Sequence, residues 1–124
     1  MLDLYQRIAD IAQKSFNDVV NSADFLGGTP ANPDKVRILI KDGSFLDIWL
    51  SEEGDYSYHW ERRRQSGEIF RWDNAPHHPQ INTYPDHFHK YTERNVVSSK
   101  LSSNFDLAVP EVLEFIREYL SKNK

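Results

Sequence analysis

Apolar residues recur at three- and four-residue intervals over residues 1–21, with charged residues between them, and this period predicts an amphipathic helix. Its apolar positions are Leu4, Ile8, Ile11, Ala12, Phe16, Val19 and Val20. Asp3 and Gln6 have the spacing of a capping box at the start of this helix. A second helix is expected over residues 110–122, where Pro110 suits the first helical turn and the residues after it supply a broad apolar face.

Between these helices, residues 35–73 show the alternation and turn signals of two β-hairpins. Asp42-Gly43 separates two β-rich runs over 35–41 and 44–51, and this dipeptide favours a tight turn because both residues tolerate positive φ. Strands over 55–63 and 68–73 are joined by a turn at 65–67, and residues 95–99 form a further short strand or extended segment. The sequence therefore predicts a single α+β domain over residues 1–124, with an antiparallel sheet of four to five strands and helices at both ends.

The register of the second hairpin follows from its turn. A three-residue loop with Gly67 in the left-handed conformation pairs Arg64 with Glu68. The ladder then continues through Arg62–Phe70, Glu61–Arg71, Trp60–Trp72 and His59–Asp73. One face receives the aromatic side chains, which we interpret as core. The other receives Ser57, His59, Glu61, Arg63, Arg71 and Asp73, where opposite charges face each other across the strands.

Composition narrows the class of protein. A chain of 124 residues with 39% hydrophobic and 27% charged residues is typical of one globular domain. It contains no cysteine, which excludes disulfides, thiol nucleophiles, zinc ribbons and iron–sulfur clusters. No apolar run approaches about 18 residues, and the chain does not begin with a basic segment followed by an apolar one. We expect a cytoplasmic protein without a membrane anchor.

Charge and histidine are unevenly distributed. The chain carries −4, yet residues 57–95 carry +1 and contain all five histidines, which leaves −5 for the remainder. An acidic protein is a poor non-specific nucleic-acid binder, although a local basic patch can contact RNA or an acidic partner. Residues 74–93 form an irregular stretch rich in proline and histidine. A loop of about 20 residues in a compact domain is more often functional than idle.

Three strings within residues 56–97 carry a family resemblance. They are YSYHW on the third strand, FRWDNAPHH leaving the fourth, and PDHFHK at the end of the loop. With the preceding DGS hairpin and the terminal apolar helix, the chain resembles the TumE family, small toxins of bacterial and archaeal toxin–antitoxin pairs. The resemblance implies a toxin that acts on RNA and is neutralised by a helix-turn-helix antitoxin. The site itself is assigned from the residues.

RNA cleavage without a metal needs a base for the 2′-hydroxyl proton, an acid for the leaving oxygen and positive charge at the phosphate. Imidazole serves either proton-transfer role near neutral pH, and the arginine guanidinium matches phosphate oxygens. We therefore assign catalytic roles to His59, Arg71, Asp73, His77 and His78, with Asp73 orienting His59. Substrate contacts are assigned to Arg63, Asn74, His87 and His89, and no cofactor is expected. In the simpler interpretation, the charged cross-strand pairs only fix the register.

Two other interpretations of the same residues stay open. His87 and His89 project to the same side of an extended segment, so these two with His77, His78 and a carboxylate of Asp73 or Asp86 suit a metal site. Alternatively, they are surface histidines hydrogen-bonded to backbone. Alternation along the strand places Arg63 on the His59 face and its neighbours Arg62 and Arg64 on the other. The three arginines are equally consistent with charges that keep a strand end near a turn soluble.

The leading hypothesis is thus a metal-independent endoribonuclease toxin. The alternatives are a metal-dependent nuclease that uses the histidine-rich loop and a non-catalytic protein-binding module. The expected partners are the antitoxin and RNA, a homodimer is left open, and no membrane is expected.

Overall fold

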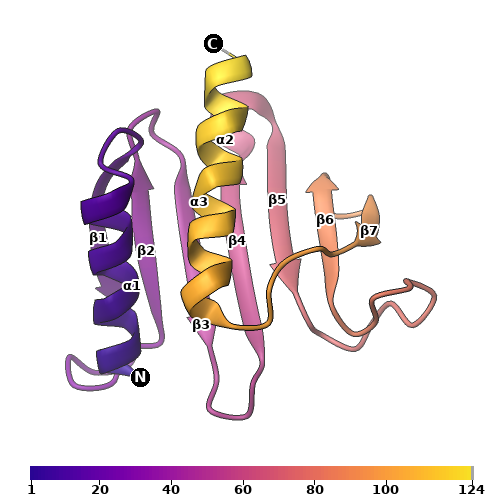
Figure 1. Cartoon of the computed structure of the whole chain (residues 1–124), viewed down its shortest axis with the longest axis horizontal. Helices are drawn as coiled ribbons and strands as arrows, with labels where there is room; N and C mark the ends of the chain where they lie inside the picture. Colours follow the sequence, from indigo (N-terminus) through magenta and orange to yellow (C-terminus); the bar gives the residue numbers. More distant parts are fainter. Residues whose placement is uncertain (124) are drawn as a thin grey trace.

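The computed structural model describes residues 1–123 and has an α+β fold (Figure 1). The helices are α1 (Leu2–Ser15), α2 (Arg63–Ser66) and α3 (Phe105–Lys122). The strands are β1 (Val20–Leu26), β2 (Lys35–Ile40), β3 (Phe45–Leu50), β4 (Tyr56–Arg62), β5 (Glu68–Asp73), β6 (His87–Tyr91) and β7 (Val96–Ser98). All strands form one antiparallel sheet in the order β1 to β7. The fold class is confirmed, but the sheet has seven strands, and the prediction of four to five was wrong.

The two long helices lie on the same face of the sheet, α1 over β1 and β2 and α3 over the central strands (Figure 1). The core fills the space between them. Phe115 of α3 makes edge-on contacts with the rings of Trp60, Phe70 and Trp72, which confirms that the aromatic stripe of β4 and β5 is core. Within residues 1–123, no helix covers the opposite face of the sheet, which we call the open face. No helix in this range is long and apolar enough to cross a membrane.

The first helix is shorter than predicted. It ends at Ser15, and residues 20–26 instead form β1, which pairs with β2. Pairing satisfies the backbone groups of this segment while Val19 and Val20 still enter the core, so a strand uses the same apolar residues that resembled a helix face. The capping box is also absent: Met1 is the N-cap residue, and Asp3 lies in the first turn.

The last helix begins earlier than predicted. The side chain of Asn104 accepts a hydrogen bond from the backbone N–H of Asp106 (2.9 Å) and caps a helix that starts at Phe105. Pro110 therefore lies inside the helix, where its ring forgoes one backbone hydrogen bond.

The hairpin of β4 and β5 has the predicted faces but a different register. Residues 63–66 form the short helix α2, and Gly67 ends it in the left-handed conformation with φ 78°. The longer connection pairs Arg62 with Glu68, His59 with Arg71 and Trp60 with Phe70, so the predicted ladder was wrong by two residues. Because side chains alternate with period two, an even shift leaves each residue on its predicted face.

The irregular stretch expected over 74–93 is interrupted by a strand: residues 87–91 form β6 between β5 and β7, so residues 74–86 and the turn after β6 are irregular. Phe88 packs in the core, stacked on Trp72 with ring centroids 4.3 Å apart. His87 and His89 consequently lie on the open face. The short strand expected near residues 95–99 is confirmed as β7.

Candidate active site

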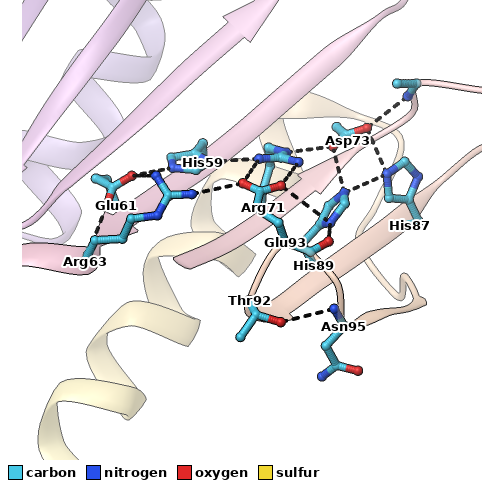
Figure 2. A network of polar contacts seen from close by, with 11 residues as sticks. His59, Glu61, Arg63, Arg71, Asp73, His87, His89, Thr92, Glu93 and Asn95 are labelled. Carbon is cyan, nitrogen blue, oxygen red and sulfur yellow. Dashed lines mark hydrogen bonds and ion pairs between the residues drawn. The ribbon is translucent and has the colours of Figure 1, made fainter. Parts of the chain in front are cut away.

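A row of polar residues crosses the open face, one from each strand from β2 to β6. Cross-strand pairing places Arg37, Asp47, His59, Arg71 and His89 in successive register. Neighbouring strands are about 4.8 Å apart, so each of these side chains stands beside the next. The adjacent row brings Asp73 of β5 opposite His87 of β6. Figure 2 shows where the two rows meet around Arg71.

Arg71 is the centre of this network. Its Nε donates to Asp73 Oδ2 (2.9 Å), and its two terminal nitrogens donate to the carboxylate of Glu93 (2.7 and 2.6 Å). Arg63 donates to the same carboxylate (3.2 Å). The hydrogen bond from Arg71 holds the pKa of Glu93 below its ordinary value, and Glu93 in turn raises the pKa of Arg71. Two guanidinium groups thus converge on one anionic position.

The turn between β6 and β7 carries Glu93, and local hydrogen bonds brace it. The backbone N–H of Asn95 donates to Thr92 Oγ1 (3.2 Å; Figure 2). The Asn95 side-chain amide donates to the carbonyl oxygen of Lys90 (3.0 Å). Glu93 is not among the predicted site residues. No pattern signals it, because its contact with Arg71 depends on how β6 and its turn fold back beside β5.

His59 is oriented by Glu61 and not by Asp73 as predicted. Its Nε2 lies 3.0 Å from Glu61 Oε1, and its Nδ1 lies 3.4 Å from Nη1 of Arg71. A carboxylate only accepts and a guanidinium only donates, so a neutral ring with its proton on Nε2 fits both contacts. Burial alone raises the pKa of Glu61, but the bonds from His59 and the Arg63 backbone outweigh it and hold the pKa below its ordinary value.

His87 and His89 lie on the other side of Arg71 and are 2% and 4% exposed. Each ring donates its Nδ1 proton to a backbone carbonyl, His87 to Pro85 (2.9 Å) and His89 to Glu93 (2.9 Å). The two Nε2 atoms therefore face each other, 3.1 Å apart. The carboxylate of Asp73 approaches both, with its oxygens 3.0 Å from His87 Nε2 and 3.5 Å from His89 Nε2.

Asp73 is fixed by more than these histidines. Its Oδ1 also accepts from the backbone N–H of Ala75 (3.0 Å), and its Oδ2 accepts from Arg71. Burial alone raises the pKa of this carboxyl, but the bonds from His89, Ala75 and Arg71 outweigh burial and hold the pKa well below its usual range. Asp73 is therefore ionised at neutral pH and forms the anionic centre between Arg71 and the histidines.

His78 joins this group from the loop that follows β5. Its half-buried ring lies 4.7 Å from that of His87 and 5.6 Å from that of His89, measured between centroids. Partial desolvation, together with those two neighbours, lowers the pKa of His78. We call His78, His87 and His89 the histidine cluster. His77 is exposed and lies outside it.

Asn74 and Arg63, both predicted to contact substrate, differ from each other in their surroundings. Asn74 braces the backbone next to the site: it accepts from the Tyr56 N–H and donates to the Gly54 carbonyl, both at 3.0 Å. Its role in substrate contact stays a prediction. Arg63 begins α2 and is not the strand residue that was predicted, but it reaches the site through Glu61 and Glu93. Its neighbour Arg62 is buried on the helix side of the sheet, over the rings of Trp60 and Tyr119.

Comparison with known proteins identifies the family. A scan against protein-family models matches residues 8–120 to the family described as Toxin TumE. Searches of curated proteins and of solved structures found no match. The matched region contains the seven strands, most of both long helices and every site residue described above. The chain therefore belongs to the TumE toxin family.

Proposed function

We propose that this toxin is an endoribonuclease whose active site is the part of the open face centred on Arg71. The observation that carries the proposal is the order of the row: Arg71 stands between an imidazole of β4, His59, and the histidine cluster. Cleavage through the 2′-hydroxyl needs a base and an acid on opposite sides of the phosphate, with positive charge between them. The row supplies these groups in that order.

The reaction can be written with this chain's own groups and without a metal. His59 accepts the 2′-hydroxyl proton on Nδ1, while Glu61 stabilises the imidazolium that forms. The 2′-oxygen then bonds to phosphorus, and the bond from phosphorus to the 5′-oxygen breaks. The protonated form of His78, made a stronger acid by its lowered pKa, donates its proton to that leaving oxygen. The products are a 2′,3′-cyclic phosphate and a free 5′-hydroxyl.

Arg71 and Arg63 bind the phosphate in this scheme, and Asp73 positions Arg71. The carboxylate of Glu93 accepts bonds from both arginines and so lies where a phosphate would be bound. Glu93 is 45% exposed, and its side chain can turn into solvent when a phosphate replaces it. Asn74 lines the same pocket as Arg71 and Asp73, and we propose that it and the exposed His77 contact neighbouring nucleotides.

The test is cleavage of a labelled RNA by the purified protein, with and without a chelator. We expect cleavage that survives chelation, cyclic-phosphate ends, and loss of activity in His59→Ala and Arg71→Ala. Arg64→Ala is the matched control, since Arg64 is exposed in α2 and is not part of the network. Circular dichroism of each variant checks folding. Full activity of folded Arg71→Ala would contradict the assignment.

A metal-dependent nuclease is the second candidate, and the convergence of three imidazoles in the histidine cluster favours it. Cleavage that stops on chelation and returns with added Zn²⁺ would select it. The third hypothesis is a non-catalytic protein-binding module, and the absence of cleavage in every condition would support that one.

The proposed partner is an antitoxin, in agreement with membership of a toxin family. We propose a helix-turn-helix protein encoded beside the toxin gene. Co-expression of that neighbour should restore the growth of cells that produce this chain, and the two proteins should co-purify. Size-exclusion chromatography with light scattering tests whether the toxin alone is a homodimer, the state that the sequence leaves open.

A further inference from the structure

We propose that the histidine cluster, with the carboxylate of Asp73 beside it, binds one divalent transition-metal ion. The ligands are Nε2 of His87, Nε2 of His89, a ring nitrogen of His78 and a carboxylate oxygen of Asp73. This inference goes beyond the endoribonuclease proposal and does not depend on it, because ion binding is measured without RNA. The ion would occupy the His78 nitrogen that donates the proton in the metal-independent reaction, so that reaction belongs to the metal-free protein.

The hydrogen bonds of the two buried rings carry the first step. His87 and His89 each donate Nδ1–H to a backbone carbonyl, so in the neutral rings each Nε2 presents a lone pair. These lone pairs face one another at 3.1 Å, with the Asp73 oxygens 3.0 and 3.5 Å away. With both rings neutral, four electron-rich atoms thus point at one another in a buried place. Without a metal ion, a proton on Nε2 that is hydrogen-bonded to Asp73 relieves their repulsion, and a bound cation would take the place of that proton.

The distances fit an ion of the size of zinc. At a Zn–N distance of about 2.0–2.1 Å, two ligand atoms of a tetrahedral site lie about 3.3 Å apart. The Nε2 atoms of His87 and His89 already lie at nearly that separation. Ligand nitrogens of all three histidines lie within 4.8 Å of one another, and His78 comes from a loop and is half-buried. A small turn of its ring therefore completes the set.

The surroundings of the ligands resemble those of metal sites. Metal-bound histidines usually donate the second ring proton to a carbonyl or a carboxylate, which fixes the tautomer and the ring orientation. His87 and His89 both do so, through Pro85 and Glu93. The carboxylate is also held, by Arg71 and by the Ala75 amide.

The donor set indicates the class of ion. Three imidazoles and one carboxylate suit Zn²⁺, Co²⁺ or Ni²⁺, whereas Mg²⁺ and Ca²⁺ prefer sites made of oxygen alone. The chain has no cysteine, so the nitrogen-rich cluster does not compete with a thiolate site elsewhere in the protein.

The experiment titrates the chelator-stripped full chain with Zn²⁺ against a chromophoric chelator, and with Co²⁺ for its absorption spectrum. His78→Ala is compared with His77→Ala: the two residues are neighbours in the same loop, but one belongs to the cluster and the other does not. We expect one ion per chain for the wild type and for His77→Ala. The affinity should fall about tenfold or more in His78→Ala. Zn²⁺ should raise the melting temperature of the first two proteins and have little effect on that of the third.

His89→Gln gives a second reading at a buried ligand, with circular dichroism as the check on folding. If His89→Gln does not fold, the comparison of His77→Ala with His78→Ala is sufficient to test the proposal. The proposal is overturned if the stripped wild type binds no Zn²⁺, if several ions bind weakly, or if binding survives His78→Ala. In those cases a shared proton between His87 and His89 accounts for their contact. One bound Zn²⁺ per chain, together with no RNA cleavage by either the stripped or the Zn²⁺-loaded protein, would refute the endoribonuclease proposal and leave this one standing.

Discussion

Replacing Glu93 with glutamine should increase the affinity of the protein for RNA. The carboxylate of Glu93 accepts two hydrogen bonds from Arg71 and one from Arg63, so RNA must displace it before a phosphate reaches either guanidinium. Glu93→Gln keeps the size of the side chain and removes its charge. The backbone carbonyl of Glu93, which accepts from His89, is unchanged by the substitution.

The magnitude follows from exposure. Glu93 is 45% exposed, so its pairing with Arg71 is screened by solvent and is worth about 0.2–1 kcal/mol. Removing this competition should tighten RNA binding by up to about fivefold. The expected change in the salt dependence of RNA binding is relatively larger than the change in affinity. Each phosphate that gains a cationic partner steepens the dependence of log affinity on log salt by about 0.7 for a single strand. One or two freed arginines should therefore steepen the slope by about 0.7 to 1.4.

Fluorescence anisotropy with a 2′-O-methyl RNA measures both quantities, because this RNA lacks the hydroxyl that the proposed reaction uses. Glu52→Gln is the control, since Glu52 is exposed in the turn between β3 and β4 and the substitution changes net charge equally. The reasoning is refuted if Glu93→Gln and Glu52→Gln give the same affinity and the same salt slope.

Three further predictions concern stability. The carboxylate of Asp47 accepts hydrogen bonds from Lys35 and Arg37. Burial raises the pKa of Asp47, but these bonds outweigh burial and hold its pKa below the ordinary value. The contribution of Asp47 to the free energy of unfolding is therefore complete above about pH 4 and is lost as the pH falls. Asp47→Asn should lower the free energy of unfolding by about 1–3 kcal/mol at neutral pH and reduce its acid dependence, as measured by urea denaturation at two pH values. Tyr5→Phe should cost about 1–3 kcal/mol in the same assay with an unchanged m-value, because the fully buried hydroxyl accepts from the Leu50 N–H (3.0 Å), which would lose its partner. Gly67→Ala should cost about 1–2 kcal/mol by thermal unfolding, because Gly67 has φ 78° and space for a Cβ, so that backbone conformation alone opposes the change.

Local signals in the sequence predict much of the fold. The Asp-Gly turn, the left-handed Gly67 and the alternation of β4 and β5 each act over a few residues, and all three are present in the structure. The strand β1 could not be predicted in this way. It is an edge strand, its buried positions show no period of two, and its pairing with β2 is a tertiary event.

The sequence predicts only part of the site, again because it carries local signals and not the tertiary pairing of strands. Alternation correctly puts His59, Arg71 and Asp73 on one face, because parity does not depend on the length of the turn. Which residue of β5 faces His59 does depend on it, since α2 adds residues to the connection and puts Arg71 there. The sequence predicts a loop at His87 and His89, because prolines and histidines hide the strand pattern of β6. Their shared direction was nonetheless predicted from their spacing, and it is confirmed.

The core on one face of the sheet fixes the chemistry on the other. Phe88 is 9% exposed and stacks on Trp72, which holds β6 in register against β5. His87 and His89 are its two neighbours in the strand, so the packing of one aromatic ring places both imidazoles opposite Asp73 and Arg71. Their Nδ1 bonds to backbone carbonyls then set the direction of each ring. The site therefore needs no covering helix: the buried face of the sheet supplies its rigidity, and its open face keeps the arginines and His78 within reach of a ligand.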